Sequence, residues 1–211
     1  MLLSRRARGT DDTISLPASL LVADGFYFKC FQHPTAAHYC IKVMLPQHHP
    51  ARFRRCVRYF KALHRRGIYL DHIAAFHGLI NTSLGKGAIF EMVLDDDGRV
   101  SKSLDHYLAL NDKRFNAWVI REIESLKQSL HNYWIASYDL NPTNVLVKRL
   151  GFDEFRLVVV GGIGDNQLFP LASYSRIYAR KKLASAWNPG YQQWYAEYPS
   201  VLRRLKPYLV V

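Results

Sequence analysis

The chain is poor in cysteine and in acidic residues, and it lacks any long apolar run. Its 211 residues include three cysteines, an odd number without a Cys-x2-Cys spacing. This favours a reducing compartment and argues against a zinc site. No apolar stretch approaches the roughly 20 residues of a membrane span, and residues 1–8 show no long apolar stretch after their charges, so we expect no secretory signal. We therefore expect a cytoplasmic protein, either free or held peripherally at the inner membrane surface.

Acidic residues are too few to balance the basic ones. The chain has 29 Lys and Arg against 17 Asp and Glu, a formal net charge of +12. This charge implies an anionic partner or surface, such as nucleotide phosphates, phosphorylated glycans, acidic lipid headgroups or nucleic acid. Nucleic acid is the less favoured partner because no recognised nucleic-acid motif is present. The sequence gives no signal for the oligomeric state.

Hydrophobic patterning predicts an α+β fold of the protein-kinase-like kind. Aromatic and β-branched runs separated by turn formers predict five antiparallel strands, with one helix between Pro50 and Gly67 after the third strand. The second half predicts a long helix around 115–130, a short hairpin, and further helices around 173–183 and 190–198. We expect a small antiparallel β lobe over 14–94 and a shortened, mainly α lobe over 95–211, meeting in a cleft near Leu94. The expected strands cover 16–22, 26–31, 38–45, 73–80, 88–94, 145–147 and 157–160.

The segment 138–147 carries the most specific motif, an Asp and an Asn five residues apart before an apolar strand. In phosphotransferases of the kinase fold, the Asp orients or deprotonates the attacking hydroxyl and the Asn holds a magnesium ion. These roles predict Asp139 as the catalytic residue and Asn144 as a metal ligand, with Pro142 stiffening the turn. The alternative is an ordinary Asx/Pro surface turn before a strand.

Basic residues form a stripe on the predicted helix that starts near Pro50. Their spacing places them on one face, away from the apolar residues of the same helix. The stripe is either a solvated face or a binding surface for an anionic partner. A second basic segment, 174–182, has interleaved aromatic residues. The residues of the stripe are Arg54, Arg58, Lys61 and Arg65.

Several ordered segments together resemble the YrbL family of PhoP regulatory network proteins. The resemblance covers roughly residues 20–190. It implies a fold similar to protein kinases and to bacterial lipopolysaccharide-core and sugar kinases, with ATP and magnesium as the implied ligands. The segments that carry it are 29–34, 40–43, 55–60, 139–144 and 162–164 with 170–172.

The resemblance assigns further roles residue by residue. Lys42, in the third predicted strand, matches the lysine that contacts the nucleotide α- and β-phosphates; the alternative is a surface lysine at a strand end. Asp139 matches the catalytic Asp and Asn144 the metal-binding Asn. The segment 91–93 resembles the linker between the lobes, where the backbone groups of Glu91 and Val93 would meet an adenine.

Other parts of a kinase are absent. The nucleotide-covering segment 21–26 keeps only Gly25, although glycines let the backbone approach phosphates closely. The predicted helix has no acidic residue to pair with Lys42, and Cys56 lies near the expected position. Gly161 stands where the second metal-binding Asp belongs, and glycine offers magnesium no side-chain oxygen. Asp165, four residues later, is the first candidate for a substitute ligand.

These losses favour a pseudokinase, a kinase-like binding or regulatory module that holds ATP weakly and with little help from magnesium. The first alternative is an active, atypical kinase for a small molecule such as a sugar or lipopolysaccharide-core group. The second alternative is a binder of anionic surfaces or nucleic acid that uses the basic stripe.

Overall fold

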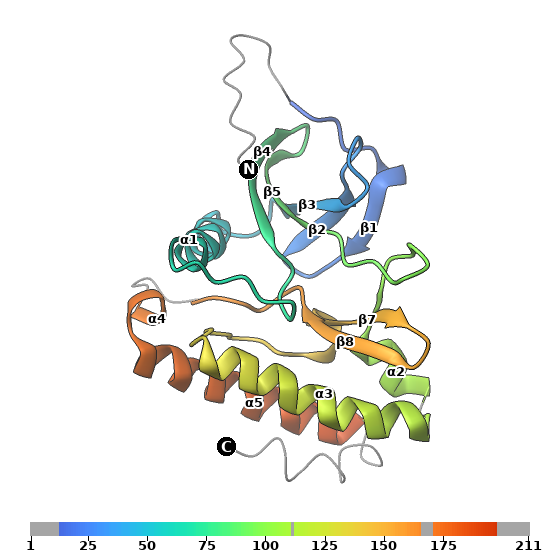
Figure 1. Cartoon of the computed structure of the whole chain (residues 1–211). Coiled ribbons are helices and arrows are strands. Elements are labelled where there is room, and N and C mark those ends of the chain that lie inside the picture. Colours follow the sequence, from blue (N-terminus) through green and yellow to red (C-terminus); the bar gives the residue numbers. More distant parts are fainter. Residues whose placement is uncertain (1–12, 111, 166–170, 198–211) are drawn as a thin grey trace.

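The computed structural model describes residues 13–110, 112–165 and 171–197. It has two layers (Figure 1). The upper layer is a five-stranded sheet with one helix, and the lower layer is a three-stranded sheet packed on helices. The upper sheet is antiparallel, in the order β1-β2-β3-β5-β4. Its elements are a short 3-10 turn (Ala18–Leu20), β1 (Leu21–Asp24), β2 (Phe28–Gln32), β3 (Tyr39–Met44), α1 (Ala51–Arg65), β4 (Phe76–Thr82) and β5 (Gly85–Glu91).

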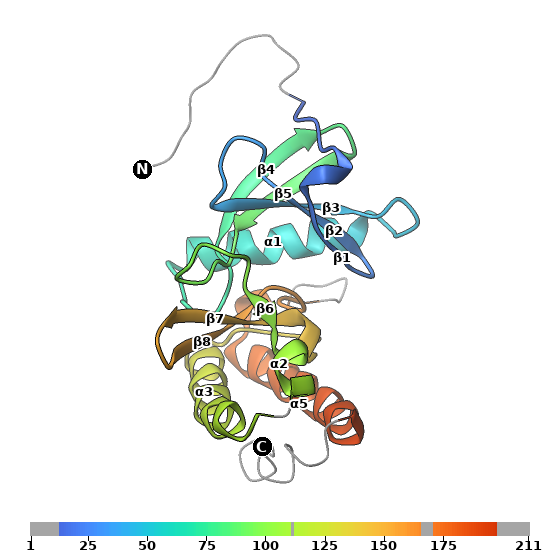
Figure 2. The same ribbon diagram turned by 90° about the vertical axis from the view of Figure 1, so that its right-hand side faces the viewer.

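Helix α1 connects β3 to β4 and lies across one side of this sheet (Figure 2). It starts after Pro50 and is followed by Gly67, whose φ of 66° suits the end of a helix. Its apolar face packs on the sheet, where Phe53, Val57 and Phe60 join one cluster with residues of β3, β4 and β5. The four residues of the basic stripe are all exposed.

The lower layer holds most of the buried apolar residues. Helices α3 and α5 lie side by side beneath β7 and β8 in both views (Figures 1 and 2). The antiparallel sheet order is β6-β7-β8. The elements are β6 (Lys102–Ser103), α2 (Leu104–Leu110), α3 (Lys113–Asn132), a 3-10 turn (Pro142–Asn144), β7 (Val145–Gly151), β8 (Glu154–Val159), α4 (Leu171–Tyr174) and α5 (Arg176–Glu197).

The predicted α+β, kinase-like class is the class of this structure, and the five upper strands, α1, α3 and the β7–β8 hairpin were expected. Two elements were missed, β6 and α2, because neither is long enough to show a period. The prediction of two helices around 173–183 and 190–198 is wrong. One helix, α5, continues through Pro189, and its first half packs into the lower core through Ala179, Leu183 and Ala186. In the part of the chain that the structure describes, no helix is long and apolar enough to cross a membrane.

Candidate functional site

A cleft of about 530 Å³ lies between the two layers. The β1–β2 turn, β3, β5 and α1 line it from above, and the segments 138–144 and 160–163 line it from below. Three predicted site residues meet here: Lys42 from β3, with Asp139 and Asn144 from the loop before β7. Lys42 and Asn144 are far apart in sequence, so the two-layer fold brings them together.

The loop that carries Asp139 is held by its own side chains. Asp139 Oδ1 accepts a hydrogen bond from the Asn141 backbone N–H at 3.1 Å, and its Oδ2 accepts one from Asn144 Nδ2 at 2.9 Å. Asn141 Oδ1 accepts from the Thr143 N–H at 3.2 Å, which caps the short turn that starts at the buried Pro142. The Asp and the Asn of the motif therefore contact each other directly, and both are fixed before any ligand enters.

Gly162 lies against this loop more closely than any other residue type could. Its φ is 72°, a left-handed conformation that favours glycine. A Cβ at this position would lie 2.6 Å from the carbonyl carbon of Asp139 and overlap the carbonyl oxygen. The Gly162 carbonyl accepts hydrogen bonds from the Tyr138 N–H at 2.9 Å and from Ser137 Oγ at 2.8 Å. Sequence reasoning assigned no role to Gly162, although the run of glycines at 161–164 was the available signal.

Gly161 is where the second metal-binding Asp was expected, and the neighbouring side chain fills the space. A Cβ on Gly161 would lie 2.8 Å from Asn144 Cγ, so the Asn144 amide occupies the volume of a side chain at 161. The Asn144 carbonyl also accepts hydrogen bonds from the N–H groups of Val160 at 2.8 Å and Gly161 at 3.3 Å. Any side chain at position 161 must therefore shift the Asn144 side chain.

Lys42 has a backbone partner in place of an acid. Its ammonium group donates a hydrogen bond to the Val160 carbonyl and lies 5.1 Å from the centre of the Phe90 ring. Helix α1 has no Asp or Glu, and Cys56 is its residue lining the cleft nearest the expected position of an acid. Lys42 therefore contacts the backbone of Val160, the residue immediately before Gly161.

The turn between β1 and β2, which would cover a nucleotide, is aromatic. The Arg52 guanidinium of α1 lies 3.8 Å from the centre of the Tyr27 ring, and His48 Nε2 is 2.7 Å from the Phe26 carbonyl oxygen. The Asp24 carboxylate lies 3.4 Å from Lys29 Nζ. The Arg52 contact attaches the turn to α1, and the His48 contact attaches it to the segment before α1. None of these contacts was expected from the sequence.

Arg52 also connects this turn to the loop of Asp139. Its side chain and that of Tyr138 line one small pocket. Burial raises the pKa of Tyr138 to about 12, with Cys56 adding to the rise and Arg52 opposing it. Tyr138 therefore stays a neutral hydroxyl at physiological pH.

Asp165 is not among the described residues that line the cleft, and its carboxylate contacts the first turn of α4. Its side chain is buried, Oδ2 accepts a hydrogen bond from the Ala172 N–H at 3.2 Å, and Oδ1 is 3.9 Å from Lys182 Nζ. The carboxylate thus helps to position α4 and pairs with α5. Its role as a substitute metal ligand stays a prediction, and it requires this carboxylate to leave both partners.

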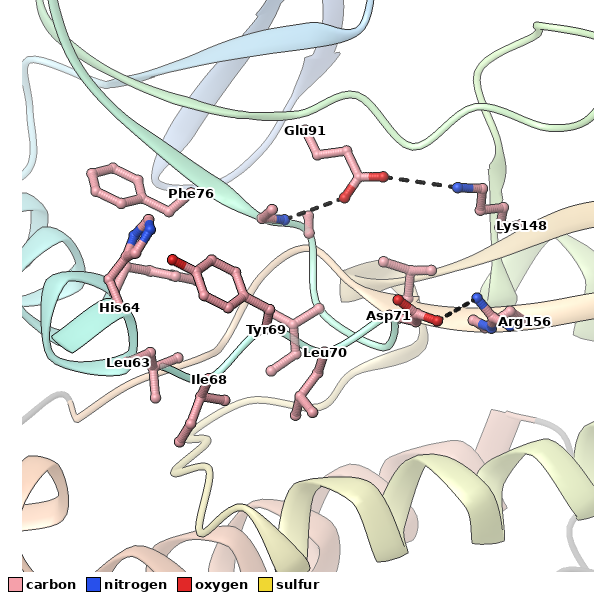
Figure 3. Close-up of a pocket in the computed structure, with 15 residues that line it drawn as sticks. Leu63, His64, Ile68, Tyr69, Leu70, Asp71, Phe76, Glu91, Lys148 and Arg156 are labelled. Atoms are coloured by element: carbon pink, nitrogen blue, oxygen red, sulfur yellow. Dashed lines mark hydrogen bonds and ion pairs between the residues drawn. The ribbon is translucent and has the colours of Figure 1, made fainter. Parts of the chain in front are cut away.

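Glu91 lines a second, smaller pocket of about 180 Å³, together with residues of α1, the segment 68–76, β7 and β8 (Figure 3). Its carboxylate is 3.8 Å from Lys148 Nζ and accepts a hydrogen bond from the Ala75 N–H at 3.4 Å. Its carbonyl lies 3.7 Å from Cys40 Sγ, and the Val93 carbonyl accepts from the Ser101 N–H at 3.0 Å. Neither Glu91 nor Val93 is among the described residues that line the main cleft. Their contact with an adenine stays a prediction.

The sequence profile of the family described as PhoP regulatory network protein YrbL matches residues 14–193. The chain belongs to the YrbL family. It is 29% identical over 167 residues to the YrbL protein of Escherichia coli (strain K12), which spans 78% of this chain and 80% of that protein. The YrbL protein of Shigella flexneri matches with the same identity and spans.

The YrbL-family chain is also similar in fold to a protein kinase. The kinase domain of Mycobacterium tuberculosis PknI, in a mutant form, superposes with a TM-score of 0.50. The match covers 80% of this chain and 71% of that domain, at 17% sequence identity. Identity this low supports the kinase-like fold alone.

Proposed function

We propose that this YrbL-family chain is a pseudokinase, a kinase-like binding or regulatory module whose cleft holds ATP weakly and without effective help from magnesium. The observation that carries the proposal is the arrangement at Gly161. The residue offers no carboxylate, and the Asn144 amide lies in the space where a side chain at 161 would be.

Magnesium prefers six oxygen ligands in nearly octahedral geometry and keeps several waters when the protein supplies few. The loop below the cleft offers a metal the Asn144 amide and the Asp139 carboxylate, which are hydrogen-bonded to each other. A metal would have to separate them. Losing the carboxylate at 161 removes several kcal/mol of transition-state stabilisation from a phosphoryl transfer.

Lys42 supports nucleotide binding without a metal. Its ammonium group lies in the cleft and has a carbonyl partner rather than a carboxylate. A carbonyl leaves the positive charge uncompensated, so phosphate oxygens gain a point-charge partner when they enter.

The experiment is a thermal-shift titration of the chain with ATP, once with a chelator and once with magnesium. A ligand that binds the folded state raises its melting temperature in proportion to the logarithm of its concentration above Kd. The expected result is a modest stabilisation that is the same under both conditions. It should be lost in Lys42→Ala and kept in Lys61→Ala, which removes an exposed lysine of α1 instead. Stabilisation that requires magnesium, or that survives Lys42→Ala unchanged, contradicts the proposal.

The second candidate function is an active kinase for a small molecule such as a sugar. The observation in its favour is that Lys42, Asp139 and Asn144 share one cleft, with Asp139 and Asn144 already 2.9 Å apart through their hydrogen bond. In this alternative a substitute ligand replaces the carboxylate missing at 161, and a proton-accepting Asp139 activates the acceptor hydroxyl.

A further inference from the structure

All three cysteines of the chain gather around Lys42. Cys30 on β2 is the register partner of Lys42 on β3, so both side chains are on the same face of the sheet. Cys40 precedes Lys42 by two residues and therefore shares that face. Cys56 comes from α1, which packs over it, and all three thiols belong to one hydrophobic cluster. The three thiols are free.

The three thiols differ in access. Cys30 and Cys56 line the main cleft, whereas Cys40 is 4% exposed and does not. A small reagent that enters the cleft therefore meets two sulfurs first. The cleft volume of about 530 Å³ is within the range of small-molecule sites, which hold ligands of drug size.

The two accessible thiols differ in ionisation. The neighbouring Cys40 thiol lowers the pKa of Cys30 from 9.0 to about 7; desolvation opposes this shift and the Lys42 charge assists it. Burial raises the pKa of Cys56 to about 11, against a smaller effect of Lys42. The other charged group on the facing wall is Asp139. Near neutral pH, Cys30 thus carries thiolate while Cys56 stays protonated.

We infer that Cys30 is a covalent modification site, which exchanges with low-molecular-weight disulfides to give a mixed disulfide beside Lys42 in the cleft. The Cys30 thiolate attacks one sulfur of R–S–S–R, a Cys30–S–S–R bond forms, and the original S–S bond breaks. The leaving thiolate R–S⁻ takes the electron pair and then a proton from water. The disulfide itself is the oxidant, so no further co-reactant is needed.

The mixed disulfide persists rather than passing to Cys40. Resolution requires Cys40 to attack as a thiolate, but the Cys30 thiol and burial both raise the pKa of Cys40. Cys40, whose Sγ donates to the Glu91 carbonyl at 3.7 Å, therefore stays protonated beside Cys30. The inference stands independently of nucleotide binding, since exchange needs only the thiol, its neighbours and the open cleft.

The rate follows from the two pKa values. At pH 7, a thiol with a pKa of about 7 is roughly fifty times more ionised than one at 9.0, but its thiolate is several times less nucleophilic. The net expectation is exchange about 5-fold faster than that of a thiol with the ordinary pKa. The rate should rise with pH and level off above about 7.

The test uses the full chain with oxidised glutathione, followed by intact mass and peptide mapping. The expected product is one glutathione adduct, on Cys30. It should be absent in Cys30→Ser and unchanged in Cys56→Ser, the matched variant in the same cleft. In Cys40→Val the rate midpoint should move up towards 9.0, the ordinary value.

Four results overturn the inference. They are an adduct mainly on Cys56 or Cys40, an adduct of equal yield in Cys30→Ser, loss of the adduct to a Cys30–Cys40 disulfide, and a wild-type rate midpoint near 9. Peptide mapping and the pH profile use the unmodified chain, so they decide the question even if a variant fails to fold.

Discussion

Replacing Gly162 with alanine should weaken the fold and the candidate site together. Gly162 has a φ of 72°, and an added Cβ would overlap the carbonyl of Asp139. The left-handed conformation costs an alanine about 1 kcal/mol. Relief of the overlap moves the loop away from the Gly162 carbonyl, which accepts from Tyr138 N at 2.9 Å and Ser137 Oγ at 2.8 Å. Each weakened bond adds about 1 kcal/mol, so the expected loss is about 3 kcal/mol of unfolding free energy.

The matched control is Gly98→Ala. Gly98 has a similar φ of 78°, but a Cβ there meets no atom within 4 Å. It should therefore cost about 1 kcal/mol, from backbone conformation alone. For a chain of this length these losses correspond to falls in Tm of about 10 °C for Gly162→Ala and about 3 °C for Gly98→Ala. Thermal unfolding followed by circular dichroism measures both. Equal falls in Tm would refute the close approach of Gly162 to the Asp139 loop.

Three further predictions follow from the same structure. Gly161→Asp should lower the free energy of unfolding by about 1 kcal/mol without metal, since it displaces the Asn144 amide. It should also make ATP affinity, measured by calorimetry, depend on magnesium. Gly161→Asn should lower the stability equally but should leave ATP affinity independent of magnesium. Tyr59→Phe should lower stability by about 2 kcal/mol in denaturant unfolding, because the buried Ala136 N–H loses its 2.7 Å acceptor, whereas Tyr69→Phe at an exposed ring should change it little. Charge reversal in the stripe should weaken binding to acidic vesicles, and the effect should shrink with added salt. If vesicle binding is unchanged by the substitution, the stripe serves only to keep the protein soluble. The reversed residues are Arg54, Arg58 and Arg65.

Local patterns predicted the elements that carry the site. The spacing of Asp139 and Asn144 before an apolar strand predicted the loop, and the family resemblance assigned Lys42 to the facing wall. The order of strands and helices, typical of a kinase-like fold, then placed these residues on opposite walls of one expected cleft. The family resemblance agreed with this reading, and the match over residues 14–193 now shows the family.

Contacts between side chains that are far apart in the sequence could not be predicted from it. The Asn144 amide fills the space beside Gly161 only because the backbone of 160–161 pairs with the Asn144 carbonyl. The partnership of Arg52 with the Tyr27 ring depends on how the β1–β2 turn folds onto α1. Strand register decides that Cys30 faces Lys42, and a shift of one residue would have placed its thiol on the other side of the sheet.

The measurement that tests the pseudokinase account most directly is ATP turnover and phosphotransfer by the unmodified chain in magnesium, with Asp139→Asn measured beside it. Acceptors should include water and simple sugars. The account predicts rates near background for both proteins, because no carboxylate stands at 161 to hold the metal against the phosphates. Robust, magnesium-dependent phosphotransfer that Asp139→Asn abolishes would contradict it. That result would establish an active kinase with a substitute ligand, and Asp165 would be the first residue to replace.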